Sequence, residues 1–272
     1  MAILGGAAFW QADEDGAGRG LGLALERGVN HLDIAPQYGA AEETVGPHLP
    51  ALRDQLFIGC KTLRHNAAGV RAQLEESLRR FGTDHVDLYQ LHAVTTIAEL
   101  DRRADALAAI ERARDDGLTR FIGITGHDLT VPATMLEALR RFDFDTVMFP
   151  IYPRLWSLPE YREPAEELLV MCVERDVGVM AIKAAARRRW DPDADHAPSP
   201  WYEPHTEPDA IARGVAFALD TPGVTAFCTP GSAELLPRVL DAADAYAPMT
   251  GEQRDQAITA MSAEEPIFPM AG

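Results

Sequence analysis

Lysine is almost absent from this chain of 272 residues: its 25 basic residues include only two lysines, Lys61 and Lys183. Cysteine is also scarce, and Cys60, Cys172 and Cys228 are odd in number, far apart and set in apolar runs. This usage argues against a disulfide framework and against a cysteine-rich zinc site, and it predicts small core residues. The rarity of lysine gives particular weight to the two positions that keep it.

Long apolar runs and a basic start are missing as well. No run approaches the roughly 18 apolar residues that a membrane span needs, and the first residues lack the charge of a secretory signal. We therefore predict a cytoplasmic protein. A formal net charge of -17 predicts no nucleic-acid or membrane partner. The one candidate for a local basic patch is Arg187, Arg188 and Arg189. The scattered histidines show no HExxH or similar pairing, so we predict no metal.

The order of apolar and amphipathic segments predicts the fold. Hydrophobic residues make up 47% of the chain, and short β-rich runs alternate with segments of helical spacing, which is typical of repeated βα units around a parallel sheet. Eight such units favour one α/β domain over residues 1–272, a (β/α)8 TIM barrel, over an open doubly wound sheet, which stays possible. The predicted strands are 2–8, 31–35, 57–61, 86–91, 121–125, 146–151, 179–183 and 224–228.

Glycine and proline mark the boundaries of these units. Residues 70–81 have the spacing of an amphipathic helix, and Gly82, Gly117 and Gly178 are predicted to end helices. No GxGxxG follows the first strand, and the Gly5–Gly6 pair is attributed to tight packing at the start of the barrel. We expect a long loop at 184–204 and an irregular tail at 248–272, both near the mouth of the barrel.

Polar residues collect where the predicted strands end. Lys61 and Lys183 each end a strand, Asp33 and Tyr38 belong to the second strand and its loop, and His92 follows the fourth strand. In a (β/α)8 barrel these ends form the catalytic mouth. Taken singly, Asp33 could cap a helix, Tyr38 could be a half-buried aromatic and His92 a hydrogen-bonded core histidine. Their coincidence on one rim favours a catalytic group.

The segment GVNHLDIAPQYGAAEETVG resembles the part of the aldo-keto reductase family in which a strand Asp precedes a loop Tyr-Gly and a Glu that leads a helix. FIGCKT, SLRRFGTDHVDLYQLH and GLTRFIGIT continue the resemblance in order, over about residues 28 to 126. The resemblance implies a nicotinamide-dependent reductase of a small-molecule carbonyl substrate. It places the family's catalytic tetrad on Asp33, Tyr38, Lys61 and His92.

The chemistry of carbonyl reduction agrees with this assignment. Hydride delivery to a carbonyl carbon makes an alkoxide, which needs a proton donor within hydrogen-bond reach, and Tyr38 would supply the proton. We expect the Lys61 ammonium, held by Asp33, to lower the pKa of Tyr38 toward neutral pH. His92 would orient and polarise the carbonyl.

The resemblance further implies NADP, with NAD also possible, as the cofactor. The residues expected to bind it are Thr125, Gly126, Lys183, Thr229, Gly231, Ser232 and Arg238, and the arginines at 187–189 are candidates for the pyrophosphate. The chain departs from the family pattern at several of these places: Gly126 and His127 stand for Ser-Asn, Met148 for Gln, Ala233 for a phosphate-binding Arg and Asp241 for Asn.

Four aromatic residues in the loops after the first and seventh strands are candidates for an apolar substrate pocket: Trp10, Trp190, Trp201 and Tyr202. They could equally fix the loops in place. Two other functions stay open beside the reductase: a redox-independent lyase, dehydratase or epimerase, including a Schiff base on Lys183, and a non-catalytic binding or regulatory subunit. The oligomeric state is open.

Overall fold

A closed barrel of eight parallel strands forms the centre of the protein in a computed structural model that describes residues 1–191, 193, 194, 196, 199 and 201–269. The strands follow the order β1-β10-β7-β6-β5-β4-β3-β2, so the first strand closes the ring against the last. The predicted (β/α)8 TIM barrel is confirmed. Its strands are β1 (Ala2–Gly5), β2 (His31–Asp33), β3 (Phe57–Thr62), β4 (Val86–Leu91), β5 (Thr119–Thr125), β6 (Thr146–Pro150), β7 (Gly178–Ile182) and β10 (Ala226–Cys228).

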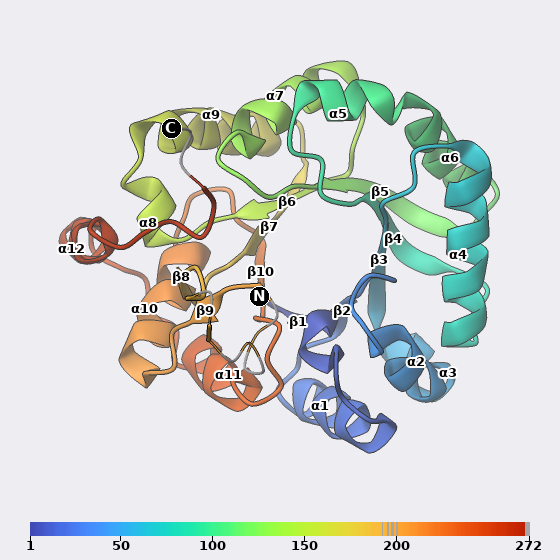
Figure 1. The fold of residues 1–272 in the computed structure, drawn as a ribbon, viewed down its shortest axis with the longest axis horizontal. Coiled ribbons are helices and arrows are strands. Elements are labelled where there is room, and N and C mark those ends of the chain that lie inside the picture. Colours follow the sequence, from blue (N-terminus) through green and yellow to red (C-terminus); the bar gives the residue numbers. More distant parts are fainter. Residues whose placement is uncertain (192, 195, 197–198, 200, 270–272) are drawn as a thin grey trace.

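Helices surround the barrel as an outer ring (Figure 1). They are α1 (Glu14–Glu26), α2 (Ala41–Val45), α3 (Leu49–Leu52), α4 (Ala67–Phe81), α5 (Ile97–Arg102), α6 (Ala104–Asp115), α7 (Val131–Arg141), α8 (Pro153–Trp156), α9 (Pro159–Glu174), α10 (Pro208–Leu219), α11 (Leu236–Asp244) and α12 (Gly251–Met261). Short 3-10 turns are η1 (Gly6–Phe9), η2 (Gly46–His48) and η3 (Arg53–Gln55).

Helix α4 illustrates how the local sequence sets these elements. The Asn66 side chain accepts a hydrogen bond from the Gly69 amide and caps the helix, which begins three residues before the predicted start at 70. Leu74 and Leu78 recur on the buried face, as the spacing predicts. Gly82 ends the helix with a φ of 59°, the left-handed conformation that glycine adopts without strain.

The alternation of side chains along the strands separates two apolar layers. In β4, Tyr89 and Leu91 belong to the large core between the strands and the helices, whereas Leu88 belongs to a small cluster on the opposite face, inside the barrel. Gln90 lies on the same face as Leu88. The inner faces of the strands therefore carry polar groups toward the carboxyl end of the barrel.

The Gly5–Gly6 pair lies where the barrel closes. A Cβ at Gly5 would lie 2.4 Å from the carbonyl oxygen of Thr229, and one at Gly6 would lie 2.9 Å from Cγ1 of Ile34. The attribution to tight packing is confirmed. The first predicted strand was too long, however, because the chain turns into η1 after Gly5 and the amide of Trp10 bonds back to the carbonyl of Ala7.

Two boundary predictions differ in an informative way. Gly117 follows α6 with a φ of 76°, as expected for a helix end, but Gly178 is the first residue of β7 and was wrongly assigned as a cap. The left-handed residue after α9 is Asp176, with a φ of 56°. Aspartate tolerates this conformation better than most residues, so a glycine is not required there.

The long loop and the tail contain more structure than expected. Within 184–204, which lies partly outside the described residues, β8 (Ala186–Arg188) pairs antiparallel with β9 (Glu203–Pro204). The tail was wrongly predicted as irregular throughout: α12 begins at a capping box in which Thr250 and Gln253 bond to each other's backbone. The apolar spacing of this helix is weak, and only Ala257 and Met261 are buried.

The three cysteines are buried and unpaired, as predicted for core residues. Within the described part of the chain, every helix is too short or too polar to cross a lipid bilayer.

Candidate active site

A cavity of about 400 Å³ lies at the carboxyl ends of the barrel strands. Strand ends and loops from both halves of the chain contribute to it, including two residues of the C-terminal tail. Its lining residues are Gly5, Ala7, Asp33, Gln37, Tyr38, Lys61, His92, Thr125, His127, Met148, Ile182, Lys183, Trp201, Tyr202, Cys228, Thr229, Pro230, Gly231, Ile267 and Phe268.

Lys61 connects an acid and a phenol in the wall of this cavity. Its Nζ lies 2.6 Å from Oδ2 of Asp33 and donates across 3.0 Å to Oη of Tyr38. Lys61 is only 1% exposed and Asp33 only 2%. The other Asp33 oxygen, Oδ1, accepts from Nε2 of Gln90 at 3.2 Å. The buried lysine is therefore paired with a carboxylate that a second strand holds in place.

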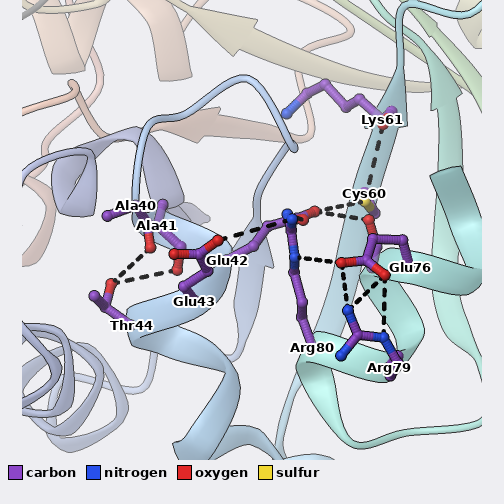
Figure 2. Close-up of polar contacts among 11 residues, drawn as sticks. Ala40, Ala41, Glu42, Glu43, Thr44, Cys60, Lys61, Glu76, Arg79 and Arg80 are labelled. Atoms are coloured by element: carbon purple, nitrogen blue, oxygen red, sulfur yellow. Dashed lines mark hydrogen bonds and ion pairs between the residues drawn. The ribbon is translucent and has the colours of Figure 1, made fainter.

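Glu42 fixes the segment that carries Tyr38. This buried residue lies in α2, directly after the Tyr38 loop, and it accepts hydrogen bonds from Ser77 at 2.8 Å and from Nη1 of Arg80 at 2.8 Å. The Cys60 thiol contacts the same carboxylate at 3.7 Å. Figure 2 shows Glu42 between Arg80 of α4 and Cys60 of β3, the neighbour of Lys61. The contacts tie the Tyr38 loop to the strand that carries Lys61.

His92 lies beside this group. Its ring centroid is 5.9 Å from that of Tyr38, and its Nδ1 is 3.3 Å from Oε1 of Gln37. The buried Arg103 donates across 2.6 Å to the His92 carbonyl oxygen, and Ala93 follows with a φ of 57°. The chain thus turns away directly after His92, with its ring at the cavity.

Burial, rather than charge alone, sets the protonation of these groups. Burial raises the pKa of Tyr38 to about 12, although the Lys61 ammonium opposes the rise, so the expected shift toward neutral pH is wrong. Burial lowers the pKa of Lys61, but Asp33 and Tyr38 outweigh it and the pKa lies above its ordinary value. Burial and the nearby cations hold the pKa of His92 well below its usual range. Tyr38 is a neutral phenol and His92 a neutral imidazole at pH 7.

Lys183 is the second cation of the cavity and differs from Lys61. Its Nζ lies 4.4 Å from the ring centroid of Tyr202 and 5.4 Å from that of Trp201. No carboxylate among the described residues pairs with it, and burial lowers its pKa to about 8. Lys183 also has a φ of 70°, a conformation that costs free energy in a residue with a long side chain.

The residues expected to bind a cofactor separate into two groups. Thr125, Lys183, Thr229 and Gly231 line the cavity, whereas Gly126, Ser232 and Arg238 are absent from its lining. The Arg238 guanidinium donates to the carbonyl oxygen of Thr206 at 3.0 Å.

The candidate basic patch is occupied by acids. Arg187 and Arg188 both pair with Glu203, at 2.7 Å each, and Arg189 lies 3.3 Å from Glu265. These arginines do not form a free cationic surface among the described residues.

The four aromatic candidates also separate. Trp201 and Tyr202 line the cavity, and the Trp201 ring centroid lies 5.3 Å from that of Tyr38. Trp10 and Trp190 are absent from the lining. Trp190 donates from Nε1 to the Ser199 carbonyl oxygen at 2.9 Å and stacks on His196, so it holds the loop in place.

Several site residues were not singled out from the sequence. Gln90 could have been found by extending the alternation of β4, which places it two residues before His92 on one face. Gln37 lies one residue before Tyr38 but carries no distinctive pattern. Ile267 and Phe268 lie far along the chain, in a segment without periodicity, and only the folded structure brings them to the cavity.

Comparison with known proteins identifies the family of this chain. The model of the aldo/keto reductase family matches residues 2–191. This chain belongs to the aldo/keto reductase family. L-galactose dehydrogenase of Arabidopsis thaliana is 30% identical over 155 residues, covering 53% of this chain and 48% of the relative. The NAD/NADP-dependent indole-3-acetaldehyde reductase of Schizosaccharomyces pombe is 38% identical over 158 residues, covering 57% and 52%. The matches thus span about half the length of these curated relatives.

Solved structures support the same fold over nearly the whole chain. An aldo-keto reductase from Klebsiella pneumoniae, determined in complex with NADPH, has a TM-score of 0.70. It is 22% identical and covers 99% of this chain and 94% of its own.

Proposed function

We propose that this protein reduces an aldehyde or ketone to an alcohol, or catalyses the reverse oxidation, with NADPH or NADH and with Tyr38 as the general acid. The observation that carries the proposal is the Lys61 amine, which lies within hydrogen-bond distance of both Asp33 and Tyr38 at the wall of an open cavity. Family membership and the names of the curated relatives, which are reductases and dehydrogenases, support it.

Tyr38 and Lys61 divide the proton chemistry between them. A phenol with a pKa near 12 stays protonated at pH 7 and can donate to an alkoxide, which is a stronger base. The Lys61 amine already donates to the phenol oxygen, so it stabilises the phenolate that remains after transfer. Asp33 keeps Lys61 charged during this step.

His92 supplies a neutral ring next to the phenol. Because the pKa of its imidazole lies well below neutral pH, His92 acts as a hydrogen-bond donor to the carbonyl oxygen without becoming an acid itself. Because a neutral imidazole has one N–H, donation from Nε2 leaves Nδ1 as an acceptor, so the Gln37 amide turns its NH2 group toward the ring at their 3.3 Å contact. Tyr38 and His92 together hold the carbonyl with its carbon exposed to the cavity.

The cavity fits the nicotinamide end of the cofactor, which supplies a hydride when bound. Thr125 and Thr229 carry hydroxyl groups at the lining, and each also accepts a backbone amide, from Ala93 at 3.1 Å and from Gly5 at 2.9 Å, which holds its orientation. The Klebsiella pneumoniae structure of this fold holds NADPH. No unpaired arginine lines the cavity among the described residues, so the geometry does not favour a 2′-phosphate over a hydroxyl.

The test is to titrate the purified protein with NADPH and with NADH and then to add an aldehyde. We expect binding of at least one cofactor, measured by fluorescence quenching or calorimetry, and loss of its absorbance as the alcohol forms. Absence of binding to both cofactors would contradict the reductase and favour the redox-independent enzyme or the binding protein. Borohydride trapping and mass spectrometry would then reveal a Schiff base on Lys183.

A further inference from the structure

Lys183 is the only unneutralised cation among the described residues that line the cavity. The lining contains two lysines, and Lys61 is compensated by Asp33 at 2.6 Å. Lys183 faces the rings of Trp201 and Tyr202, which attract a cation weakly but do not neutralise it. A desolvated charge without a partner destabilises the folded protein, and a bound anion would relieve this cost.

The other titratable groups near Lys183 do not provide the missing charge. Burial raises the pKa of the Cys228 thiol on β10, which stays neutral. Tyr202 is likewise kept protonated by burial, and His92 and His127 are uncharged at pH 7 because burial lowers the pKa of both. The lysine therefore lies in a neutral, largely aromatic part of the cavity.

The position of Lys183 relates it to the substrate. Trp201 contacts both Lys183 and the ring of Tyr38, which is the proposed proton donor. A molecule whose carbonyl lies at Tyr38 and His92 can therefore reach along Trp201 toward the Lys183 amine. A single amine, without a neighbouring arginine, matches one negative charge.

We propose that Lys183 binds the carboxylate of the substrate, so that the preferred substrates are aldehydes or ketones that carry an acid group. The inference rests on the proposed reductase function and names the substrate class for it. A phosphate of the cofactor is the other anion that a lysine at this strand end could meet, and the experiment distinguishes the two. A pyrophosphate or a 2′-phosphate carries more charge than one amine compensates.

The kinetic test compares 4-formylbenzoate with 4-formylbenzamide, which has the same shape without the charge. We expect the wild-type kcat/KM for the acid to exceed that for the amide at least tenfold. The ratio should fall to about one in Lys183→Met and recover in part in Lys183→Arg. Arg140→Met removes the same charge from an exposed position on α7, paired with Glu167, and should leave the ratio unchanged.

A Lys183→Met variant that keeps the preference for the acid would overturn the proposal. If the Kd for NADPH also rises tenfold in this variant, Lys183 binds the cofactor and not the substrate.

A direct measurement does not require turnover. Because the chain contains only two lysines, protein labelled with ¹³C at the lysine ε-carbons has two lysine signals to follow by NMR. The Lys183 signal should titrate near pH 8, and benzoate should raise this pKa by about one unit, equivalent to tenfold tighter binding to the charged amine. Benzamide should leave it unchanged. A Lys183 pKa that does not respond to benzoate contradicts the proposal even if the protein proves to reduce no aldehyde.

Discussion

The two lysines of this chain occupy matching places in opposite halves of the barrel mouth, Lys61 in β3 and Lys183 just after β7, yet their surroundings differ. Lys61 is surrounded by groups that compensate its charge, and its pKa lies above the ordinary value. Lys183 faces aromatic rings, and its pKa falls to about 8. Both are desolvated, so burial alone does not decide the outcome; the presence of a nearby carboxylate does. One half of the mouth is a completed network, and in the other half no carboxylate of the described residues pairs with the lysine.

The completed network is tested most strongly at Tyr38. Tyr38→Phe removes the proposed proton donor, whose oxygen accepts from Lys61, and we expect kcat to fall on the order of 10³-fold, within the range typical of general-acid catalysis. The Kd for NADPH should change less than about twofold, because the hydroxyl bonds to Lys61 and not to a residue expected to bind the cofactor. Steady-state kinetics and fluorescence titration measure the two quantities. A phenylalanine variant that keeps a tenth of the wild-type kcat would remove Tyr38 from the mechanism.

Substitution of the two lysines should have opposite consequences for the free energy of unfolding. Lys61→Met leaves the buried Asp33 carboxylate without its cation, and we expect the free energy of unfolding to fall by about 3–5 kcal/mol. Lys183→Met removes a charge that pairs with no acid in the described part of the chain, and the variant should be at least as stable as the wild type at pH 7. Urea unfolding followed by circular dichroism gives both values.

The matched control for these variants is Arg140→Met, which breaks only exposed ion pairs, with Glu167 and Glu137, and should change the free energy of unfolding by less than about 0.5 kcal/mol. Equal losses in the two lysine variants would contradict the difference between their environments.

The pH dependence of kcat/KM tests the same difference between the two lysines, with a smaller expected effect. Below its pKa of about 8 Lys183 is charged, so kcat/KM for 4-formylbenzoate should decline, about tenfold at most, as pH rises through 8. Tyr38, with a pKa near 12, and His92, with a pKa well below its usual range, should add no step between pH 7 and 9.

The profile for 4-formylbenzamide should therefore be flat over this interval, as should both profiles in Lys183→Met. A step near pH 8 that persists for the neutral amide would assign the titration to another group.

The pH dependence of stability follows from the direction of the Lys183 shift. The folded pKa lies below the unfolded value of 10.5, so the folded state binds fewer protons between about pH 8 and 10.5, and the contribution of Lys183 to stability rises with pH over this window. Over this interval the free energy of unfolding of the wild type should therefore rise relative to that of Lys183→Met. Urea unfolding at pH 7.5 and 10 measures it, and an unchanged difference would argue against the lowered pKa.

The elements that sequence could predict are those with a local signal. The apolar runs located the eight barrel strands, and the scarcity of lysine drew attention to the strand ends that form the cavity. Helix α12 was missed because only two of its residues are buried. Asp176 was missed because aspartate replaces glycine in the turn.

The properties of the cavity that escaped prediction depend on depth and distance. The pKa of Tyr38 was expected to fall because Lys61 and Asp33 are visible in the sequence, whereas the burial that outweighs them is not. Likewise, Trp190 and Trp201 are equivalent as loop aromatics, and only the fold places Trp201 at the cavity. The acids that neutralise the basic patch are Glu203, at the other end of the same loop, and Glu265 in the tail, and only the fold brings them to the arginines.

The most direct measurement of the central claim is the fate of hydrogen during turnover. The wild-type protein is incubated with 4-formylbenzoate and with NADPH in which both hydrogens at C4 of the nicotinamide ring are deuterium, and the alcohol is examined by mass spectrometry. Carbonyl reduction at the Tyr38 site predicts one deuterium on the carbinol carbon for each cofactor oxidised, and loss of this product in Tyr38→Phe. An alcohol without deuterium, or no alcohol although the cofactor is bound, would contradict the account.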